Sequence, residues 1–182
     1  MINKDIKIPK LFQELHGYKS KISTIVLVYL TGIISGSIII IDLLKFNLEI
    51  WKYTLLGIIV VDIAGGVVAN LSSSTNSYYR DKKKLRIKFL LVHFIQPLVL
   101  YFIFPNSMYF FIFLFSYTII SALIINMLKE AEDQQNIAST FLTIGAILCI
   151  LIKTDYLTIN IIGVLYMIKI ILGFSVRRPR FD

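Results

Sequence analysis

One carboxylate, Asp62, lies in an otherwise apolar stretch, VVDIAGGVVAN at residues 60–70. A charged side chain at the centre of a membrane-spanning helix costs about 2.5–3.5 kcal/mol on insertion scales. Such groups therefore normally face a protein interior, where they pair with a cation or serve a pathway for an ion or solute. In such a position the Asp62 carboxylate can neutralise a bound cation or take up a proton.

A cationic side chain, Lys169 in LYMIKIILGF, also lies within an apolar segment. It lies eight residues from Arg177, and Asp62 lies nine residues from Leu71, so both reach similar depths, about 12–14 Å at about 1.5 Å per residue, from one boundary. Two alternatives follow. The ammonium group extends to the membrane surface, or it pairs with Asp62, which would otherwise be protonated.

Two further polar side chains, His93 and Gln96, occur in VHFIQPLVL and share one face of a helix because they are three residues apart. Pro97 cannot donate a backbone hydrogen bond and leaves the carbonyl of residue 93 without its helical partner, so we expect a kink. Polar neighbours can then satisfy that carbonyl.

These side chains, together with two asparagines, gather toward one side of the predicted membrane. We expect them to line a cavity for a small solute, ion or proton; the set is Asp62, His93, Gln96, Lys169, Asn70 and Asn126. The alternative is that they only join helices, since interhelical hydrogen bonds contribute about 0.6–2 kcal/mol each.

The elements that must position these residues are apolar helices. The chain has 182 residues, of which 57% are hydrophobic and 16% charged, and its mean hydropathy is +0.76. Soluble domains have about 45–50% apolar and about 25% charged residues. We therefore predict an all-α polytopic membrane protein, a bundle of six transmembrane helices at about Ile22–Ile41, Tyr53–Leu71, Phe89–Phe104, Met108–Leu128, Ile137–Ile152 and Tyr156–Val176. The third and fifth are short for a crossing.

The orientation follows from the basic residues, which are retained in the cytoplasm near the ends of spans. Six spans with the N- and C-termini cytoplasmic place 15 of the 19 Lys and Arg residues inside and only Lys45, Lys52 and Lys153 outside. We divide the chain into a basic leader (1–21), a transmembrane domain (22–176) and a basic tail (177–182), in a bacterial plasma membrane. Because topology explains the positive charge, no nucleic acid partner is expected.

The stretch NLSSSTNSYYR, residues 70–80, leads into a basic run. Its basic residues are candidates for binding anionic lipid headgroups; they are Arg80, Lys82, Lys83, Lys84 and Arg86. Alternatively, the stretch is a polar loop that caps the next helix and places Tyr78 and Tyr79 in the interfacial aromatic belt. His16 of the leader is expected to be a solvated surface residue.

Small residues occur at helical spacing in the first two spans, where they allow helices to approach closely. They are Gly32, Gly36, Gly65, Gly66 and Ala69. We expect these faces to meet and to set the helix of Asp62 against the first span. A homo-oligomer or a partner membrane protein is a further possibility for such faces.

Known catalytic patterns fit the chain poorly. DIAGGVVAN resembles the motif of CDP-alcohol phosphotransferases at Asp62, Gly66 and Ala69, but Gly65 and Asn70 replace an aspartate and an arginine of that motif. With two histidines and one cysteine, no metal or cofactor is expected. The predicted function is binding or movement of a small solute, ion or proton. The alternatives are an accessory or immunity-type membrane protein and, third, an intramembrane lipid-modifying enzyme.

Overall fold

In the described part of the chain, six helices are long and apolar enough to cross a membrane, as the sequence predicted. The computed structural model describes residues 4–179 and 181. The six helices occupy Ile22–Phe46, Ile50–Leu71, Lys83–Ile103, Pro105–Met127, Ala131–Leu151 and Leu157–Phe174. Residues 1–3 of the predicted leader, and residues 180 and 182 of the predicted tail, lie outside the described residues.

The elements follow one another with short connections. After the leader come α2 (Ile22–Leu43), η2 (Leu44–Phe46), α3 (Ile50–Leu71), α4 (Ser73–Tyr79), α5 (Lys83–Val92), α6 (Ile95–Ile103), η3 (Pro105–Ser107), α7 (Met108–Met127), α8 (Ala131–Leu151), α9 (Leu157–Met167) and a π-helical segment, η4 (Ile168–Phe174). The leader contains β1 (Asp5–Lys7), η1 (Lys10–Phe12), α1 (Gln13–His16) and β2 (Lys19–Lys21). The two strands pair antiparallel, with Ile6 opposite Ser20.

The third and fifth spans are not short, which corrects the expectation from the sequence. The third begins at Lys83 and the fifth at Ala131, each six residues earlier than predicted. Hydropathy marks only the apolar part of a helix, whereas the backbone hydrogen bonds of α5 and α8 continue through polar turns at that end. These polar turns bring charged residues to the end of the bundle.

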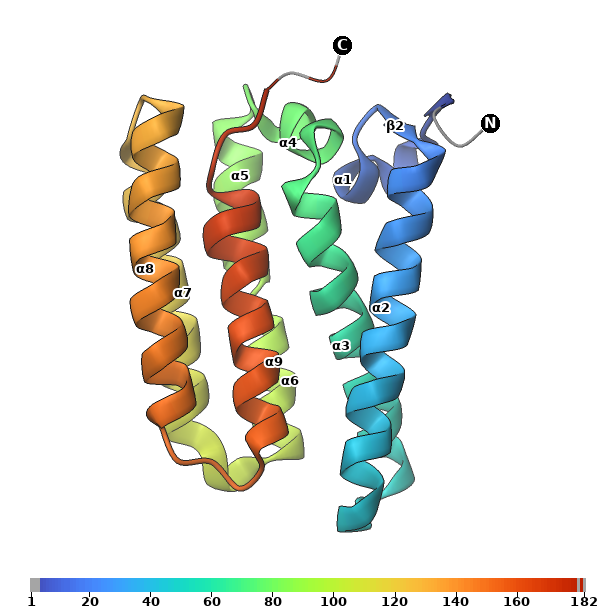
Figure 1. Cartoon of the computed structure of the whole chain (residues 1–182), viewed down its shortest axis with the longest axis vertical. Coiled ribbons are helices and arrows are strands. Elements are labelled where there is room, and N and C mark those ends of the chain that lie inside the picture. The colour runs from blue at the N-terminus through green and yellow to red at the C-terminus, as the bar shows by residue number, and fades with distance from the viewer. Residues whose placement is uncertain (1–3, 180, 182) are drawn as a thin grey trace.

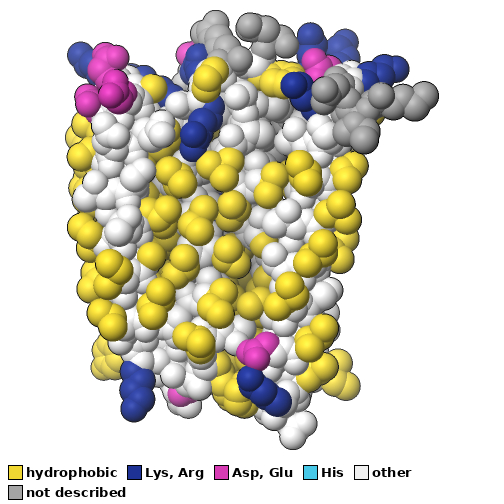
Figure 2. Space-filling model, viewed as in Figure 1, with side chains coloured by type: hydrophobic (Ala, Val, Ile, Leu, Met, Phe, Trp, Pro, Cys, Tyr) yellow, Lys and Arg dark blue, Asp and Glu magenta, His cyan; other side chains and the backbone are white. Residues whose placement is uncertain are grey.

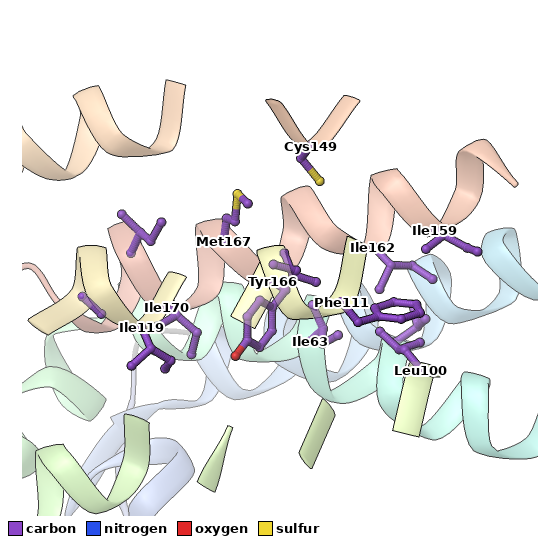
Figure 3. Packing of buried hydrophobic residues seen from close by; sticks show 14 of the residues in the cluster. Ile63, Leu100, Phe111, Ile119, Cys149, Ile159, Ile162, Tyr166, Met167 and Ile170 are labelled. Atoms are coloured by element: carbon purple, nitrogen blue, oxygen red, sulfur yellow. The ribbon is translucent and has the colours of Figure 1, made fainter. Parts of the chain in front are cut away.

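The helix α9 and its continuation η4 lie at the centre of the bundle, against α3, α7 and α8. Buried apolar side chains from five elements meet there, among them Ile63 of α3, Leu100 of α6, Phe111 of α7, Cys149 of α8 and Ile162 of α9 (Figure 3). By contrast, α2 packs mainly on α3 at one side of the bundle (Figure 1).

Hydrophobic and charged side chains occupy different levels of the surface along the long axis of the bundle. Hydrophobic groups cover the middle of the visible face, and Lys, Arg, Asp and Glu gather at its two ends (Figure 2). The first and last described segments lie at one end of the bundle, which we call the terminus end (Figure 1). An apolar band between two charged rims, on six helices of this length, indicates an integral multi-pass membrane protein.

Small residues bring α2 and α3 together. A Cβ atom added at Gly32 would lie 2.8 Å from the Val61 carbonyl oxygen, and one added at Gly65 would lie 2.9 Å from the Val28 carbonyl oxygen. At Gly36 the nearest atom is a Val61 methyl carbon at 3.0 Å. The two backbones are therefore too close for any larger residue at Gly32 or Gly65, and this contact fixes the helix that carries Asp62.

Candidate functional site

A pocket of about 190 Å³ lies between α1, α3, α5 and η4, toward the terminus end of the bundle. It brings together Asp62, Asn70, His93 and Lys169, four of the six residues proposed from the sequence as a cavity. The full lining is Glu14, Leu15, Asp62, Gly66, Asn70, Tyr79, Leu85, Lys88, Phe89, Val92, His93 and Lys169.

Asp62 is held by two donors from distant parts of the chain. Its Oδ2 atom accepts a hydrogen bond from Lys169 Nζ at 3.0 Å and another from Gln96 Nε2. The Lys169 side chain is only 3% exposed, so it pairs with Asp62 and does not extend to the surface. The Asp62 side chain is 51% exposed and lies in the wall of the pocket. Together with Gly66 and Asn70, it forms the wall that α3 contributes to the pocket.

Gly66 is the residue that gives Lys169 its path to Asp62. A Cβ atom at Gly66 would overlap Lys169 Cε and would lie 2.9 Å from its Cδ. The ammonium group thus passes over the bare backbone one helical turn beyond Asp62. Asn70, one further turn along α3, donates from Nδ2 to the Lys169 carbonyl at 3.2 Å. Together these contacts align η4 with the helix of Asp62.

The π-helical form of η4 was not anticipated. Its seven residues begin at Ile168, directly before Lys169. A π-helical turn frees some backbone carbonyls from the α-helical pattern and often occurs at functional sites. Hydropathy and periodicity carry no signal for it, since the residues are those of an ordinary apolar helix.

The helix break predicted before Pro97 lies between α5 and α6, at His93 and Phe94. The His93 carbonyl, which Pro97 cannot satisfy, accepts a hydrogen bond from the Tyr166 hydroxyl at 3.1 Å. The His93 ring lies against Phe89, with Nδ1 at 2.6 Å from the Phe89 carbonyl oxygen. Gln96 follows the break, buried, and is thereby aimed at Asp62.

Removing the Tyr166 hydroxyl tests this support. We expect Tyr166→Phe to lower the free energy of unfolding by about 1–3 kcal/mol, because it leaves a buried carbonyl without a donor. Reversible unfolding in mixed micelles measures the change. Tyr109→Phe is the matched control, since Tyr109 is 80% exposed. Equal stability of the two variants would contradict the assigned contact.

Asn126 and Arg86 lie elsewhere in the bundle. Arg86 is buried, donates from Nε to Asn126 Oδ1 at 3.0 Å and donates from Nη2 to the Phe174 carbonyl at 2.9 Å. Its guanidinium also lies over the Phe174 ring, 4.8 Å from the centroid. The structure therefore places Asn126 outside the pocket and Arg86 away from the headgroup surface, because the carbonyls at the end of η4 need donors.

The hydroxyl-rich stretch after α3 binds the leader to the bundle. Ser72 accepts from the Thr75 amide at 3.3 Å and so caps α4. Thr75 donates to the Leu15 carbonyl at 2.6 Å, and Ser74 donates to the Lys19 carbonyl at 2.7 Å and to that of His16. These bonds hold α1 against α3 and α4, where Glu14 and Leu15 complete the pocket.

Two side chains of this region are buried, against expectation. His16 packs beside Tyr29, with Nε2 at 3.2 Å from the hydroxyl oxygen, and burial lowers the pKa of His16. Tyr79 is enclosed by aromatic neighbours, Phe89 and Phe174 among them, and burial raises its pKa. The prediction of a solvated His16 is wrong, because the leader folds back onto α4 and the start of α2. Tyr79 is buried by aromatic side chains of α5 and η4, so it faces the protein interior.

The other basic residues lie at the terminus end. Lys83 and Lys84 are exposed, and the Lys82 ammonium lies over the Tyr78 ring, 3.4 Å from the centroid. Arg80 donates from Nη2 to the carbonyl of Arg178. This contact joins the start of the basic run to the chain after η4.

A comparison with protein-family models, curated proteins and solved structures finds no match to the chain. The class is therefore defined by the fold and the site: a multi-pass helical membrane protein with a polar pocket on an intramembrane ion pair. Within residues 4–179 and 181, no group of three His, Cys, Asp or Glu side chains could hold a metal ion.

Proposed function

We propose that the protein binds a small cation or a proton at Asp62 and moves it across a bacterial plasma membrane. One observation carries the proposal. Lys169 and Gln96 donate to one oxygen of the carboxylate, and Asp62, whose side chain is 51% exposed, is one of the residues that line the pocket. A ligand in the pocket can therefore contact the Asp62 carboxylate without a rearrangement of the helices.

Lys169 is the internal competitor in this mechanism. Its ammonium neutralises Asp62 while the pocket is empty, which reduces the cost of a charge at this depth. A bound cation or proton takes over that neutralisation, and Lys169 then separates from the carboxylate over the backbone of Gly66, which has no side chain to obstruct it. Gln96 keeps the carboxylate oriented in both states because its amide donates to the same oxygen.

The arrangement of polar and apolar layers supports a state open to the terminus end. Beyond Asp62, the buried side chains of Leu56, Val60 and Leu100 close the bundle. A second pocket, of about 340 Å³, lies at the opposite end and contains Asp42 and Asp155. Two pockets separated by an apolar layer favour alternating access over a continuous channel.

The orientation of this proposal follows the basic residues. Both termini are cytoplasmic in it, since fifteen of the Lys and Arg residues then lie inside and three outside. The pocket at Asp62 therefore opens to the cytoplasm.

The test uses two variants that both lack the Lys169 ammonium group, so that neither contains a buried cation without a counter-charge. Lys169→Met leaves Asp62 free of its competitor, and we expect it to bind the ligand about tenfold more tightly. Asp62→Asn in the Lys169→Met background removes the anion and should abolish binding. The probes are Na⁺, K⁺ and methylammonium, read as thermal stabilisation, and protons, read with a pH dye inside proteoliposomes.

Asp42→Asn in the Lys169→Met background is the charge-matched control for binding, read as thermal stabilisation, and should retain it because Asp42 lies in the pocket at the opposite end. If no probe stabilises the wild-type protein or Lys169→Met, and neither passes protons, the proposal is wrong. It is also wrong if the double variant, Asp62→Asn with Lys169→Met, responds like Lys169→Met alone.

A second candidate, an accessory or immunity-type membrane protein, is favoured by a different observation. Several buried amides in the chain bond to backbone carbonyls of other elements, as Asn70, Asn76 and Asn160 do, and therefore join helices. This interpretation predicts that the Asp62→Asn, Lys169→Met double variant remains active in any assay of partner binding.

A further inference from the structure

Another polar pocket, of about 630 Å³ and distinct from those at Asp62 and Asp42, lies at the terminus end where three distant segments meet. Arg80 and Lys83 come from the connection between α4 and α5 and the start of α5, and Arg177 and Arg178 follow η4. Ala131, the first residue of α8, forms another part of the wall. Four cationic side chains thus face one space, together with one carboxylate, Asp81.

Within residues 4–179 and 181, no salt bridge neutralises these four cations. The guanidinium groups of the three arginines donate instead to backbone carbonyls: Arg80 to that of Arg178, Arg177 to that of Lys129 at 3.1 Å, and Arg178 to that of Leu172 at 3.0 Å. Carbonyl oxygens orient the guanidinium groups but carry no formal charge to offset their mutual repulsion.

Two guanidinium nitrogens here are also buried without an acceptor. The Nε atoms of Arg80 and Arg178 have no hydrogen-bond partner among the described residues. A guanidinium group is matched best by an anion that accepts several hydrogen bonds in a plane, as phosphate does.

We propose that this pocket binds a phosphate group, through Arg80, Lys83, Arg177 and Arg178. Its volume of about 630 Å³ leaves room for a phosphate group that carries a polar extension such as glycerol. The elements around it belong to the charged rim at the terminus end (Figure 2). That is the depth of a lipid headgroup, and a soluble phosphate ester offers the same chemistry from the aqueous side.

The variants exploit neighbouring lysines. Lys83 and Lys84 are both exposed on α5, but only Lys83 lines the pocket. We expect Lys83→Gln and Arg177→Gln each to weaken phosphate binding about tenfold, the loss typical of one charge-assisted hydrogen bond. Lys84→Gln removes the same charge one residue away and should leave binding unchanged. Because the Lys83 side chain is exposed, its variant should fold normally.

Two arms distinguish the sources of the phosphate. In the first, phosphatidylglycerol retained by the purified full chain is counted by native mass spectrometry, with phosphatidylcholine as the reference. In the second, glycerol 3-phosphate is titrated by calorimetry. A loss confined to the Lys83 and Arg177 variants supports the site in either arm, and the arm that responds identifies the source. If Lys83→Gln equals Lys84→Gln in both arms, the proposal is overturned.

Discussion

Asp62→Asn alone is expected to lower the free energy of unfolding by about 3 kcal/mol or more, because it leaves the Lys169 ammonium buried without a counter-charge. The reverse variant, Lys169→Met, should cost much less. The Asp62 side chain is 51% exposed and keeps its bond to Gln96, whereas the Lys169 side chain is 3% exposed and has no other acceptor in the described residues. The asymmetry comes from exposure and not from the ion pair itself.

The double variant completes the cycle. Asp62→Asn with Lys169→Met removes both charges, so we expect it to recover most of the stability that Asp62→Asn loses. Replacement of a whole buried ion pair by neutral groups is often neutral or stabilising, while removal of one partner is not. Reversible unfolding in mixed micelles, with all four proteins under the same conditions, measures the coupling.

Asp42→Asn is the control for loss of a carboxylate. Asp42 is 42% exposed and pairs at 2.7 Å with Lys45, which is 59% exposed. The amide oxygen of the variant can still accept the hydrogen bond from the Thr158 hydroxyl, so little stability should be lost. If Asp62→Asn is as mild as Asp42→Asn, or if the double variant is no more stable than Asp62→Asn, the ion pair does not carry the energetic weight assigned to it.

The ion pair also shows what the sequence could predict. Depth along a helix follows from a fixed rise per residue, so equal distances from one boundary placed Asp62 and Lys169 at one level before any packing was known. The helix break at His93 was predictable for a similar reason, because proline acts on its own backbone. Both are local properties, and the six spans follow from equally local hydropathy.

The residues that sequence reasoning misplaced depend on contacts between distant segments. His16 and Arg86 are residue types that are usually found at protein surfaces. Yet His16 is buried because its leader folds back onto the bundle, and Arg86 is buried and donates to a carbonyl at the end of η4. The phosphate pocket likewise needs residues 80 and 178 to meet. No spacing within one segment reports such a meeting, and only a pattern of joint variation among relatives could have indicated it.

The adjacent glycines of α3 provide the second test, because they face different neighbours. Gly65→Ala places a methyl group 2.9 Å from the Val28 carbonyl oxygen, which is a backbone atom of α2. Neither backbone can turn aside, so the helices must separate. We expect a loss of about 1–3 kcal/mol in the free energy of unfolding, typical of overpacking. A larger distance between spin labels at the exposed positions Ile34 and Ile58 should accompany it.

Gly66→Ala places its methyl group on Lys169 Cε, which belongs to the flexible end of a side chain. The distance between α2 and α3 should therefore stay unchanged, and the cost should come from separation of Lys169 from Asp62. Because the methyl group forces the buried ammonium group away from Asp62 while the carboxylate still carries its charge, we expect a loss of about 1–3 kcal/mol here as well. The two variants thus resemble each other in stability but differ in geometry.

The Lys169→Ala background separates the two causes. Without the lysine chain, the methyl group added by Gly66→Ala occupies space that the side chain has vacated, so this substitution should cost little or even stabilise. Gly65→Ala should cost the same in both backgrounds, because its obstacle is the Val28 carbonyl. If instead Gly66→Ala keeps its full cost without Lys169, the glycine serves helix packing alone. The proposal that Lys169 reaches and leaves Asp62 over the backbone of Gly66 would then be wrong.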